Sequence, residues 1–495
     1  MFSDGYRLWS KQGFPVTTAV QDQMRPAIAP DGAGGVLVTW EDTRNGTYDI
    51  YAQHVGSIQN IYWRLNGAVV CSTAAGTYYP QIISDGANGA IIVWENLVSG
   101  GTSDIYAQRL NSSGSQLWPA AGVAVCSATN HQNRPQIVSD GAGGAIICWM
   151  DYRTGAYDIY AQRVDANGSM LWLANGVLVC GATGGQTGVK MVTDGAGGAI
   201  ICWTDSRGAA YDIYARRVNA SGTVLWTSDG VAVCAAAGNQ YNAAMVSDGA
   251  GGAIIGWEDY RGSSSDVYAQ RLNASGTALW DAGGVVACAA TAEQTVVDIT
   301  TDGSNGAIIS WQDRRSGIAS DVYAQRLDLN GDAMWWVDGI VICASDGDET
   351  WPVLTHSVAG QAIVAWNYYS STTGDDIYAL STGYYTVAVP DELPRTAVPP
   401  RVAELDQNYP NPFNPVTKIP FTLREAASVR LCVYDIAGRV VRVLEEGLLD
   451  AGRHEVTWDG QDSGGEKVAS GVYFYSIETP QTTSLTESKK MVIIR

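Results

Sequence analysis

The sequence predicts an all-β protein in which a seven-bladed β-propeller of four-stranded antiparallel blades precedes a small C-terminal β-sandwich. Three observations lead to this fold class. One unit of 54 or 55 residues recurs seven times. Apolar and polar residues alternate within each unit as they do in strands, and no part of the unit shows a helical period. Repetition at this spacing is typical of propellers, in which four-stranded sheets pack face to face around an axis.

Three markers define the unit. A Trp ends an apolar run at Trp40, Trp94, Trp149, Trp203, Trp257, Trp311 and Trp366. The Tyr of an Asp-(Ile/Val)-Tyr-Ala motif lies at Tyr51, Tyr106, Tyr160, Tyr214, Tyr268, Tyr323 and Tyr378. A second Trp lies at Trp9, Trp63, Trp118, Trp172, Trp226, Trp280 and Trp335. Because the three markers keep step, the seven units are expected to share one internal structure.

Four short strands are expected in each unit, and residues 133–180 give the clearest copy. The first two strands, PQIVS and GAIICW, flank a Gly-rich hairpin turn at 140–144 that can supply positive φ. The third strand, YDIYAQRV, is rich in aromatic and β-branched residues. A turn at 165–168 then leads into SMLW, which is expected to be the fourth strand.

The two ends of the repeat region predict how the ring closes. Residues 5–9 match the fourth strand of a unit whose first three strands are missing, and the last unit stops after residues 376–380 without a fourth strand. Pairing of 5–9 with 376–380 is expected to complete the seventh blade, and the propeller is expected to span residues 1–385. An open solenoid would instead need polar capping units at both ends.

Composition excludes several classes of function. The 495-residue chain is 46% hydrophobic with a formal net charge of −20, of which residues 1–400 carry −18. An acidic surface repels phosphate backbones, so a nucleic-acid partner is not expected. No apolar run is long enough for a transmembrane segment. Residues 1–13 lack a signal-peptide pattern, so we expect either a mature form or a fragment.

Residues that recur from blade to blade are best explained by blade construction. An Asp-x-Arg motif follows the first Trp, as at Asp151 and Arg153. It is expected to form an Arg–Asp clasp across the second hairpin, with a ring of cation or sugar-acid sites as the open alternative. Six of the nine cysteines occupy one repeat position, too far apart in neighbouring blades for disulfides, and are expected to be small buried residues. With scattered histidines and no calcium, zinc or nucleophile motif, no metal, cofactor or catalytic residue is expected.

A ligand is expected on the face formed by the second hairpin loops and the connections between blades, because these loops differ from blade to blade. One position there is nearly constant, and its residues are Gln23, Thr77, Gln132, Gln186, Gln240, Gln294 and Glu349. Two residues further on, the position varies through Arg25, Tyr79, Arg134, Gly188, Asn242, Val296 and Trp351. Amides, aromatics and arginines around a channel mouth would suit a sugar or a peptide. Alternatively, the amides satisfy the backbone of the loops.

The C-terminal region has a different composition. A Pro-rich linker is expected at 386–404 and a compact β-domain at 405–495. The motifs NYPNPFNP (408–415), VYDIAGR (433–439), WDG (458–460), SGVYF (470–474) and KKMVIIR (489–495) resemble the C-terminal sorting domain of type IX secretion substrates, which is similar to the immunoglobulin-like domain of flagellar hook-capping proteins. The resemblance implies an immunoglobulin-like sandwich, a type IX secretion partner, and release or attachment at the outer surface of a Gram-negative bacterium.

Two functions are compatible with these features. The first is a secreted or cell-surface binding or adhesion propeller that recognises an extracellular glycan or protein through its variable loops. The second is an extracellular polysaccharide-degrading enzyme, a hydrolase or lyase, that uses Glu349 with Asp346 or Asp348 near the channel mouth. The absence of catalytic motifs favours binding.

Overall fold

The computed structural model describes residues 15–57, 60–98, 100–317, 319–345, 347–356, 361–370, 374–382, 403–423, 426–435, 439–478 and 488–494. The chain divides into two units, Met1–Gly383 and Tyr384–Arg495. Every regular element of the described residues is a β-strand. No helix among them is long and apolar enough to cross a membrane.

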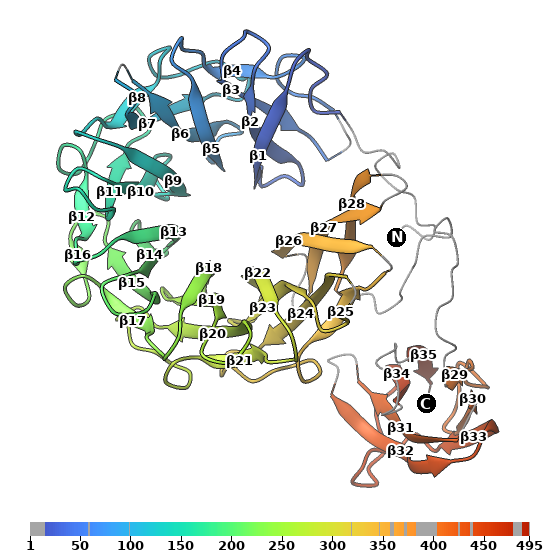
Figure 1. Cartoon of the computed structure of the whole chain (residues 1–495). Helices are drawn as coiled ribbons and strands as arrows, with labels where there is room; N and C mark the ends of the chain where they lie inside the picture. The colour runs from blue at the N-terminus through green and yellow to red at the C-terminus, as the bar shows by residue number, and fades with distance from the viewer. Residues whose placement is uncertain are drawn as a thin grey trace. The chain divides into compact units, whose positions relative to one another are not determined.

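The first unit contains seven antiparallel sheets, here called blades 1 to 7 in chain order (Figure 1). Blade 1 consists of β1 (Gln23–Pro30), β2 (Val36–Asp42), β3 (Asp49–Val55) and β4 (Ala68–Cys71). Blade 2 consists of β5 (Thr77–Ser84), β6 (Ala90–Leu97), β7 (Ser103–Leu110) and β8 (Val123–Cys126). Blade 3 consists of β9 (Gln132–Ser139), β10 (Ala145–Asp151), β11 (Asp158–Val164) and β12 (Val177–Cys180).

The later blades repeat this pattern with two variations. Blade 4 has five strands, β13 (Gln186–Thr193), β14 (Ala199–Asp205), β15 (Asp212–Val218), β16 (Val224–Leu225) and β17 (Val231–Cys234). Blade 5 consists of β18 (Gln240–Ser247), β19 (Ala253–Asp259), β20 (Asp266–Leu272) and β21 (Val285–Cys288). Blade 6 consists of β22 (Gln294–Thr301), β23 (Ala307–Asp313), β24 (Asp321–Leu327) and β25 (Ile340–Cys343). Blade 7 has three strands, β26 (Asp348–His356), β27 (Ala362–Ser370) and β28 (Gly374–Ser381).

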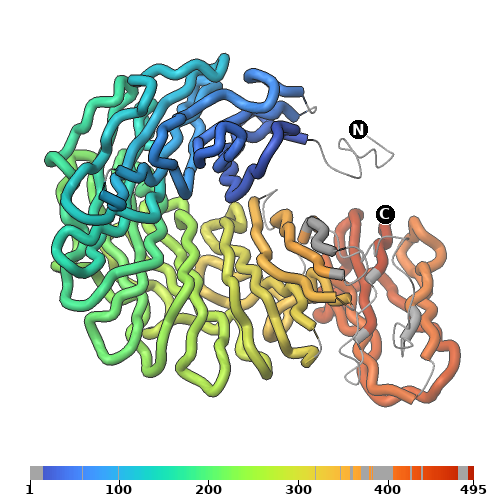
Figure 2. The backbone as a smooth tube through the Cα atoms, turned by 45° about the horizontal axis from the view of Figure 1, so that its top comes forward, coloured from blue at the N-terminus to red at the C-terminus, as the bar shows by residue number. Residues whose placement is uncertain are grey.

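The blades follow one another around a curved row, with the first strand of each towards the middle and the fourth at the outside (Figure 1). First strands of successive blades lie against one another from β1 to β26, and the tilted trace follows the same succession from blue to orange (Figure 2). Each blade is an antiparallel meander in which Trp149 of β10, for example, lies opposite Tyr160 of β11. The predicted all-β fold with propeller blades is confirmed.

The fourth strand differs from the prediction. In blade 3 the SMLW segment makes one bridge to the third strand, between Met170 and Val164, and the fourth strand is β12, which pairs with β11. Between them the chain leaves the sheet, because the side chain of Gln162 accepts a hydrogen bond from Trp172 N–H and donates one to the carbonyl of Leu173. The Trp is thereby turned towards the next blade, where its Nε1–H donates to the carbonyl of Ala220.

The core lies between blades. Trp203 of blade 4 is fully buried in the cluster that joins blades 3 and 4, together with Ile146, Cys148 and Met191. The rim of this Trp ring lies against Gly230, which has φ +91°, and an ideal Cβ at this glycine would come within 2.8 Å of the ring. The same contact occurs between Gly176 and Trp149 in blade 3. A glycine is therefore required by both backbone conformation and space.

The cysteines are buried as predicted, except for Cys343, which is half-buried. All nine are free, and eight are fully buried. Burial raises the pKa of Cys180 to about 12. These thiols are structural residues of the interior.

The Asp-x-Arg clasp forms, but with a different partner from the one expected across the hairpin. Arg207 donates to both carboxylate oxygens of Asp205 of its own motif, through Nε at 2.9 Å and Nη2 at 2.6 Å. Its guanidinium covers the Tyr214 ring at 3.8 Å and donates to the carbonyl of Asp229. The Asp of the third strand is engaged elsewhere, as Asp158 accepts the hydroxyl of Thr154. The Asp205 carboxylate is completely buried, so the motif is an internal brace.

Ring closure by residues 5–9 lies outside the described residues. The structure does place the following segment against blade 1, since Thr18 N–H donates to the side chain of Asn66 as Ser127 N–H, just after β8, donates to Asn175 of blade 3. Val16 packs beside Trp40. Residues 15–18 thus occupy the place that the end of a fourth strand takes in other blades.

The two end faces of the row expose apolar side chains that other blades bury. Ile363 of β27 is 42% exposed, whereas its counterparts Ile146 and Ile200 are inaccessible. On blade 1, Ile28 is 69% exposed, whereas its counterpart Ile82 is 6% exposed. Exposed apolar faces of this kind favour closure of the ring, because covering them removes apolar area from water.

We expect the closing strand to centre on Pro15–Thr17, with Thr17 opposite Ile377, which is the register of β12 against β11. The double variant Thr17→Cys/Ile377→Cys should form an internal disulfide under mild oxidation, because paired strands bring Cα atoms within disulfide reach. A faster-migrating band on a non-reducing gel would report the disulfide, with each single variant as control. Unchanged migration of the double variant would contradict this register.

The second unit is a two-sheet sandwich. One sheet contains β29 (Ala403–Leu405), β30 (Thr417–Leu423) and β33 (Gly452–Trp458), and the other contains β32 (Val440–Leu449), β31 (Ala427–Tyr434), β34 (Gly471–Glu478) and β35 (Ser488–Ile493). Their inner faces share a core around Phe421, Trp458 and Tyr475. The Tyr475 hydroxyl accepts a hydrogen bond from Asn408 N–H, which ties the NYPNPFNP segment to this core.

Candidate ligand face at the strand bulges

A β-bulge interrupts the first strand of every blade at the same place. The register of β5 against β6 shifts between Tyr78 and Gln81, and the other six blades shift at the equivalent position. The bulged residues adopt positive φ, and they are Arg25 (49°), Tyr79 (53°), Arg134 (53°), Gly188 (63°), Asn242 (50°), Val296 (54°) and Trp351 (55°). These are the seven variable positions noted in the sequence.

Left-handed backbone is costly for residues other than glycine and asparagine, and such strain persists only where neighbouring groups enforce it. Glutamates that follow the first Trp of the preceding blade supply this support. Glu41 accepts the backbone N–H of Tyr79 at 2.9 Å, and Glu95 accepts that of Arg134 at 2.6 Å. Glu258 accepts that of Val296 at 2.7 Å. The bulges of blades 2, 3 and 6 are thus tied to the preceding blade.

Burial shifts the pKa of two of these glutamates, Glu95 and Glu258. Burial raises the pKa of Glu95 above its ordinary value, against the hydrogen bonds from Arg134 and Asn133. Burial likewise raises the pKa of Glu258. Their oxygens are already engaged, as Glu95 accepts Asn133 Nδ2 with its second oxygen. They position the bulge and are not free to act on a ligand.

The bulges of blades 1 to 3 bring two arginines to one tyrosine. The guanidinium carbon of Arg134 lies 3.9 Å from the centre of the Tyr79 ring, and that of Arg25 lies 4.9 Å from it. Arg25 also donates to Glu41 at 2.7 Å, and its side chain is 48% exposed. Cation–π contact with an electron-rich ring holds both guanidiniums at the surface.

Exposed aromatic side chains surround the bulges on the same face. Tyr211 packs on Tyr241 of the next blade, with ring centres 5.2 Å apart, and Tyr241 contacts Tyr260 at 5.7 Å. Tyr211 is 42% exposed. On blade 7, Trp351 is 64% exposed. The face therefore offers flat, half-exposed rings at several blade junctions.

The nearly constant position lies deeper than the bulges. Four of its glutamines are inaccessible to solvent, at 132, 186, 240 and 294, and Thr77 is also buried. Their amide groups donate to carbonyls of the preceding loop, as Gln240 does to Gly238 and Gln294 does to Ala292. Gln23 is partly exposed and donates to Gln21. These amides support the loops, and their role in ligand binding stays a prediction.

The carboxylates considered for catalysis do not form an open pair. Glu349 is completely buried and accepts the hydroxyl of Ser345. Asp348 accepts the backbone N–H of Ser320. Asp346 lies outside the described residues. Across the described residues there is also no group of three or more His, Cys, Asp or Glu side chains placed to hold a metal.

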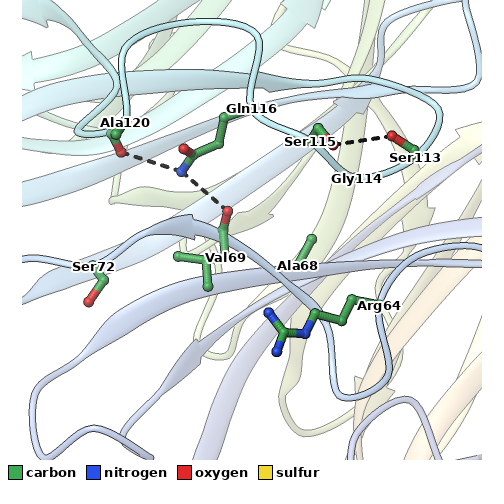
Figure 3. Close-up of a pocket in the computed structure, with 9 residues that line it drawn as sticks. All are labelled: Arg64, Ala68, Val69, Ser72, Ser113, Gly114, Ser115, Gln116 and Ala120. Atoms are coloured by element: carbon green, nitrogen blue, oxygen red, sulfur yellow. Dashed lines mark hydrogen bonds between the residues drawn. The ribbon is translucent and has the colours of Figure 1, made fainter.

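A separate hollow of about 600 Å³ lies between the outer strands of blades 1 and 2 (Figure 3). Gln116 reaches across from blade 2 and donates to the carbonyls of Val69 and Val70 of β4. Arg64 lies on the blade 1 side of this hollow. The hollow is a wide, shallow groove in which Gln116 covers the outer edge strand, and it lacks the aromatic rings of the bulge face.

Sequence reasoning found the bulge positions but missed their supports. The signal was present, since Glu41, Glu95 and Glu258 each follow the first marker Trp directly. On a strand, successive side chains point to opposite faces. The Trp packs on the preceding blade, so the side chain of the Glu that follows it must point towards the next blade.

Val296 is the bulged residue least suited to its backbone, because β-branched side chains are strained at positive φ. We expect Val296→Asn to raise the free energy of unfolding by about 1 kcal/mol, since asparagine tolerates this conformation. Asn242 already occupies the equivalent position of blade 5 at φ 50°. The reverse change, Asn242→Val, should lower stability in the same urea titration. Destabilisation by Val296→Asn would contradict the strain argument.

Comparisons with known proteins concern both units. No curated protein matches the chain significantly. Among solved structures, the polysaccharide lyase Uly1 is 8% identical over 77% of this chain and 93% of its own, with a TM-score of 0.47. A PL25 ulvan lyase is 10% identical, covering 74% of this chain and 94% of its own, with a TM-score of 0.44. A protein of unknown function from Dyadobacter fermentans is 10% identical over 72% of this chain and 93% of its own, with a TM-score of 0.40.

Likenesses this distant carry no conclusion about ligand or activity. The second unit gives a more direct match, because the family model of the FlgD Ig-like domain matches residues 413–483. This range contains most of the sandwich strands, from β30 to β34. The chain therefore carries a FlgD Ig-like domain at its C-terminal end.

Proposed function

We propose that the first unit is an extracellular binding module that recognises a glycan through the face carrying the seven bulges. One observation carries this proposal: the side chains at the seven bulged positions, which include the exposed Trp351, differ from blade to blade and stand among half-exposed tyrosines. The backbone of the bulge is the same in all seven blades, whereas its side chains differ. The backbone can therefore serve as a scaffold while the side chains provide recognition. Aromatic rings with polar tips suit sugars, which present both apolar faces and hydroxyls.

A glycan array probed with the full chain tests this proposal. The double variant Tyr211→Ala/Tyr260→Ala should lose at least tenfold in affinity for any glycan bound, because it removes two exposed rings from the face. Tyr62→Ala is the matched control, since Tyr62 is also exposed but lies beside His54, away from the bulges. Binding that is unaffected by the double variant, or lost equally in the control, would overturn the proposal.

An assay for released sugar run beside the array separates binding from degradation. The buried position of Glu349 and the engaged oxygens of Glu41 and Glu95 support a protein that binds without cleaving. Release of product by the full chain at catalytic turnover would favour the enzyme instead.

We further propose that residues 405–495 direct export through type IX secretion and place the protein outside the cell or on its outer surface. The quoted motifs and the FlgD Ig-like match support this role. Deleting 405–495 in a bacterium that possesses this secretion system should leave the propeller inside the cell envelope. Normal appearance of the shortened chain in the medium would contradict it.

A further inference from the structure

We infer that Arg25, Tyr79 and Arg134 form a subsite for an oxyanion of an acidic polysaccharide, a carboxylate or a sulfate ester. This inference rests on the proposed function and names the class of glycan. The three residues come from the bulges of three successive blades, and both guanidiniums lie over one ring, at 4.9 and 3.9 Å from its centre.

The groups left free at this subsite are hydrogen-bond donors. Glu41 accepts Tyr79 N–H with one oxygen and Arg25 Nη1 with the other. Glu95 accepts Arg134 N–H and Asn133 Nδ2 in the same way. With these acceptors occupied, a ligand meets guanidinium donors, which have no acceptor capacity of their own.

Arg134 is the residue most open to a ligand. Its side chain is exposed, and in the described part of the chain no carboxylate lies within ion-pair distance of its guanidinium. The guanidinium is fixed in place by the Tyr79 ring, so little side-chain freedom is lost on binding. A planar, pre-oriented guanidinium matches the paired oxygens of a carboxylate or sulfate.

The strongly acidic chain does not prevent this interaction. Residues 1–400 carry −18 of the net charge of −20, but at physiological salt the charges more than about 8 Å from the ligand are largely screened. Within that distance Glu41 pairs with Arg25 and the buried Glu95 lies near Arg134, so the exposed guanidinium of Arg134, which has no ion-pair partner among the described residues, provides most of the attraction at the site.

Three polymers test the inference on the full chain: polygalacturonate for carboxylates, dextran sulfate for sulfate esters and dextran as the neutral reference. One or both acidic polymers should bind more tightly than dextran, and added salt should weaken the binding. Arg134→Gln should reduce that affinity at least tenfold. Arg134→Lys should recover only part of it, because lysine keeps the charge but lacks the planar fork.

Arg64→Gln is the matched control, since it removes the same charge from the outer groove and should leave binding unchanged. Equal binding of dextran and the acidic polymers, or unchanged affinity in Arg134→Gln, would overturn the inference. If neutral glycans bind through the tyrosines while acidic ones gain nothing, the subsite fails and the proposed function stands. If no glycan of any charge binds the face, both fail.

Discussion

Replacing Asp205 with alanine is expected to lower the free energy of unfolding by about 3–5 kcal/mol, because it leaves a charged partner without compensation. The carboxylate is buried and accepts Trp203 Nε1–H together with three donors of Arg207. Burial alone would raise the pKa of Asp205, but the hydrogen bonds from Arg207 and Trp203 outweigh it and the pKa lies below its ordinary value. Urea titration followed by tryptophan fluorescence measures the loss.

Blade 2 provides the control for this prediction. It has Asn96 and Val98 at the two positions and leaves the indole Nε1 of Trp94 without a partner, yet Trp94 remains fully buried. The double variant Asp205→Asn/Arg207→Val copies this arrangement and should cost less than Asp205→Ala alone, because no unpaired charge remains. If the double variant is as destabilised as Asp205→Ala, the unpaired charge of Arg207 is not the main cause of the lost stability.

Replacing Glu349 with glutamine is expected to stabilise the protein by about 1–3 kcal/mol above neutral pH and to have no effect in acid. Burial, together with the neighbouring Asp321, raises the pKa of Glu349 to about 7 against the hydrogen bond from Ser345. Because the folded-state pKa lies above the unfolded value of 4.5, the folded state holds the proton more tightly. The stability contributed by the protonated carboxyl is therefore complete below about pH 4.5 and lost as the pH rises through 7.

Five other blades support this substitution, since glutamine occupies the equivalent position in each of them. Melting temperatures from pH 4 to pH 8 should fall less steeply in Glu349→Gln than in the parent chain, with a residual slope from Asp321, whose pKa burial raises to about 6. The matched reverse change is Gln294→Glu, which should add the same pH dependence to blade 6. Parallel pH profiles for parent and variant would contradict the assignment.

The repeat pattern predicts the blade and the order of its strands, because three markers at constant spacing require one repeated unit and an alternating pattern requires strands. It placed the fourth strand too early. SMLW has the alternation of a strand, but the side chain of Gln162 captures its backbone and turns Trp172 to the next blade. The alternation of residues within SMLW could not reveal this turn, because Gln162, which holds the segment, lies on a different strand.

The sequence also determined which positions vary between blades, and so where recognition is expected. Which side chains reach the surface there depends on contacts between blades, which appear only in the tertiary structure. A bulge two residues after the nearly constant position turns Arg25, Tyr79 and Arg134 outwards, while Thr77 and Gln132 remain buried beneath their loops. The physical reason is that a carboxylate of the preceding blade holds the bulges at Tyr79 and Arg134. A contact between residues nearly forty positions apart exists only once blades pack.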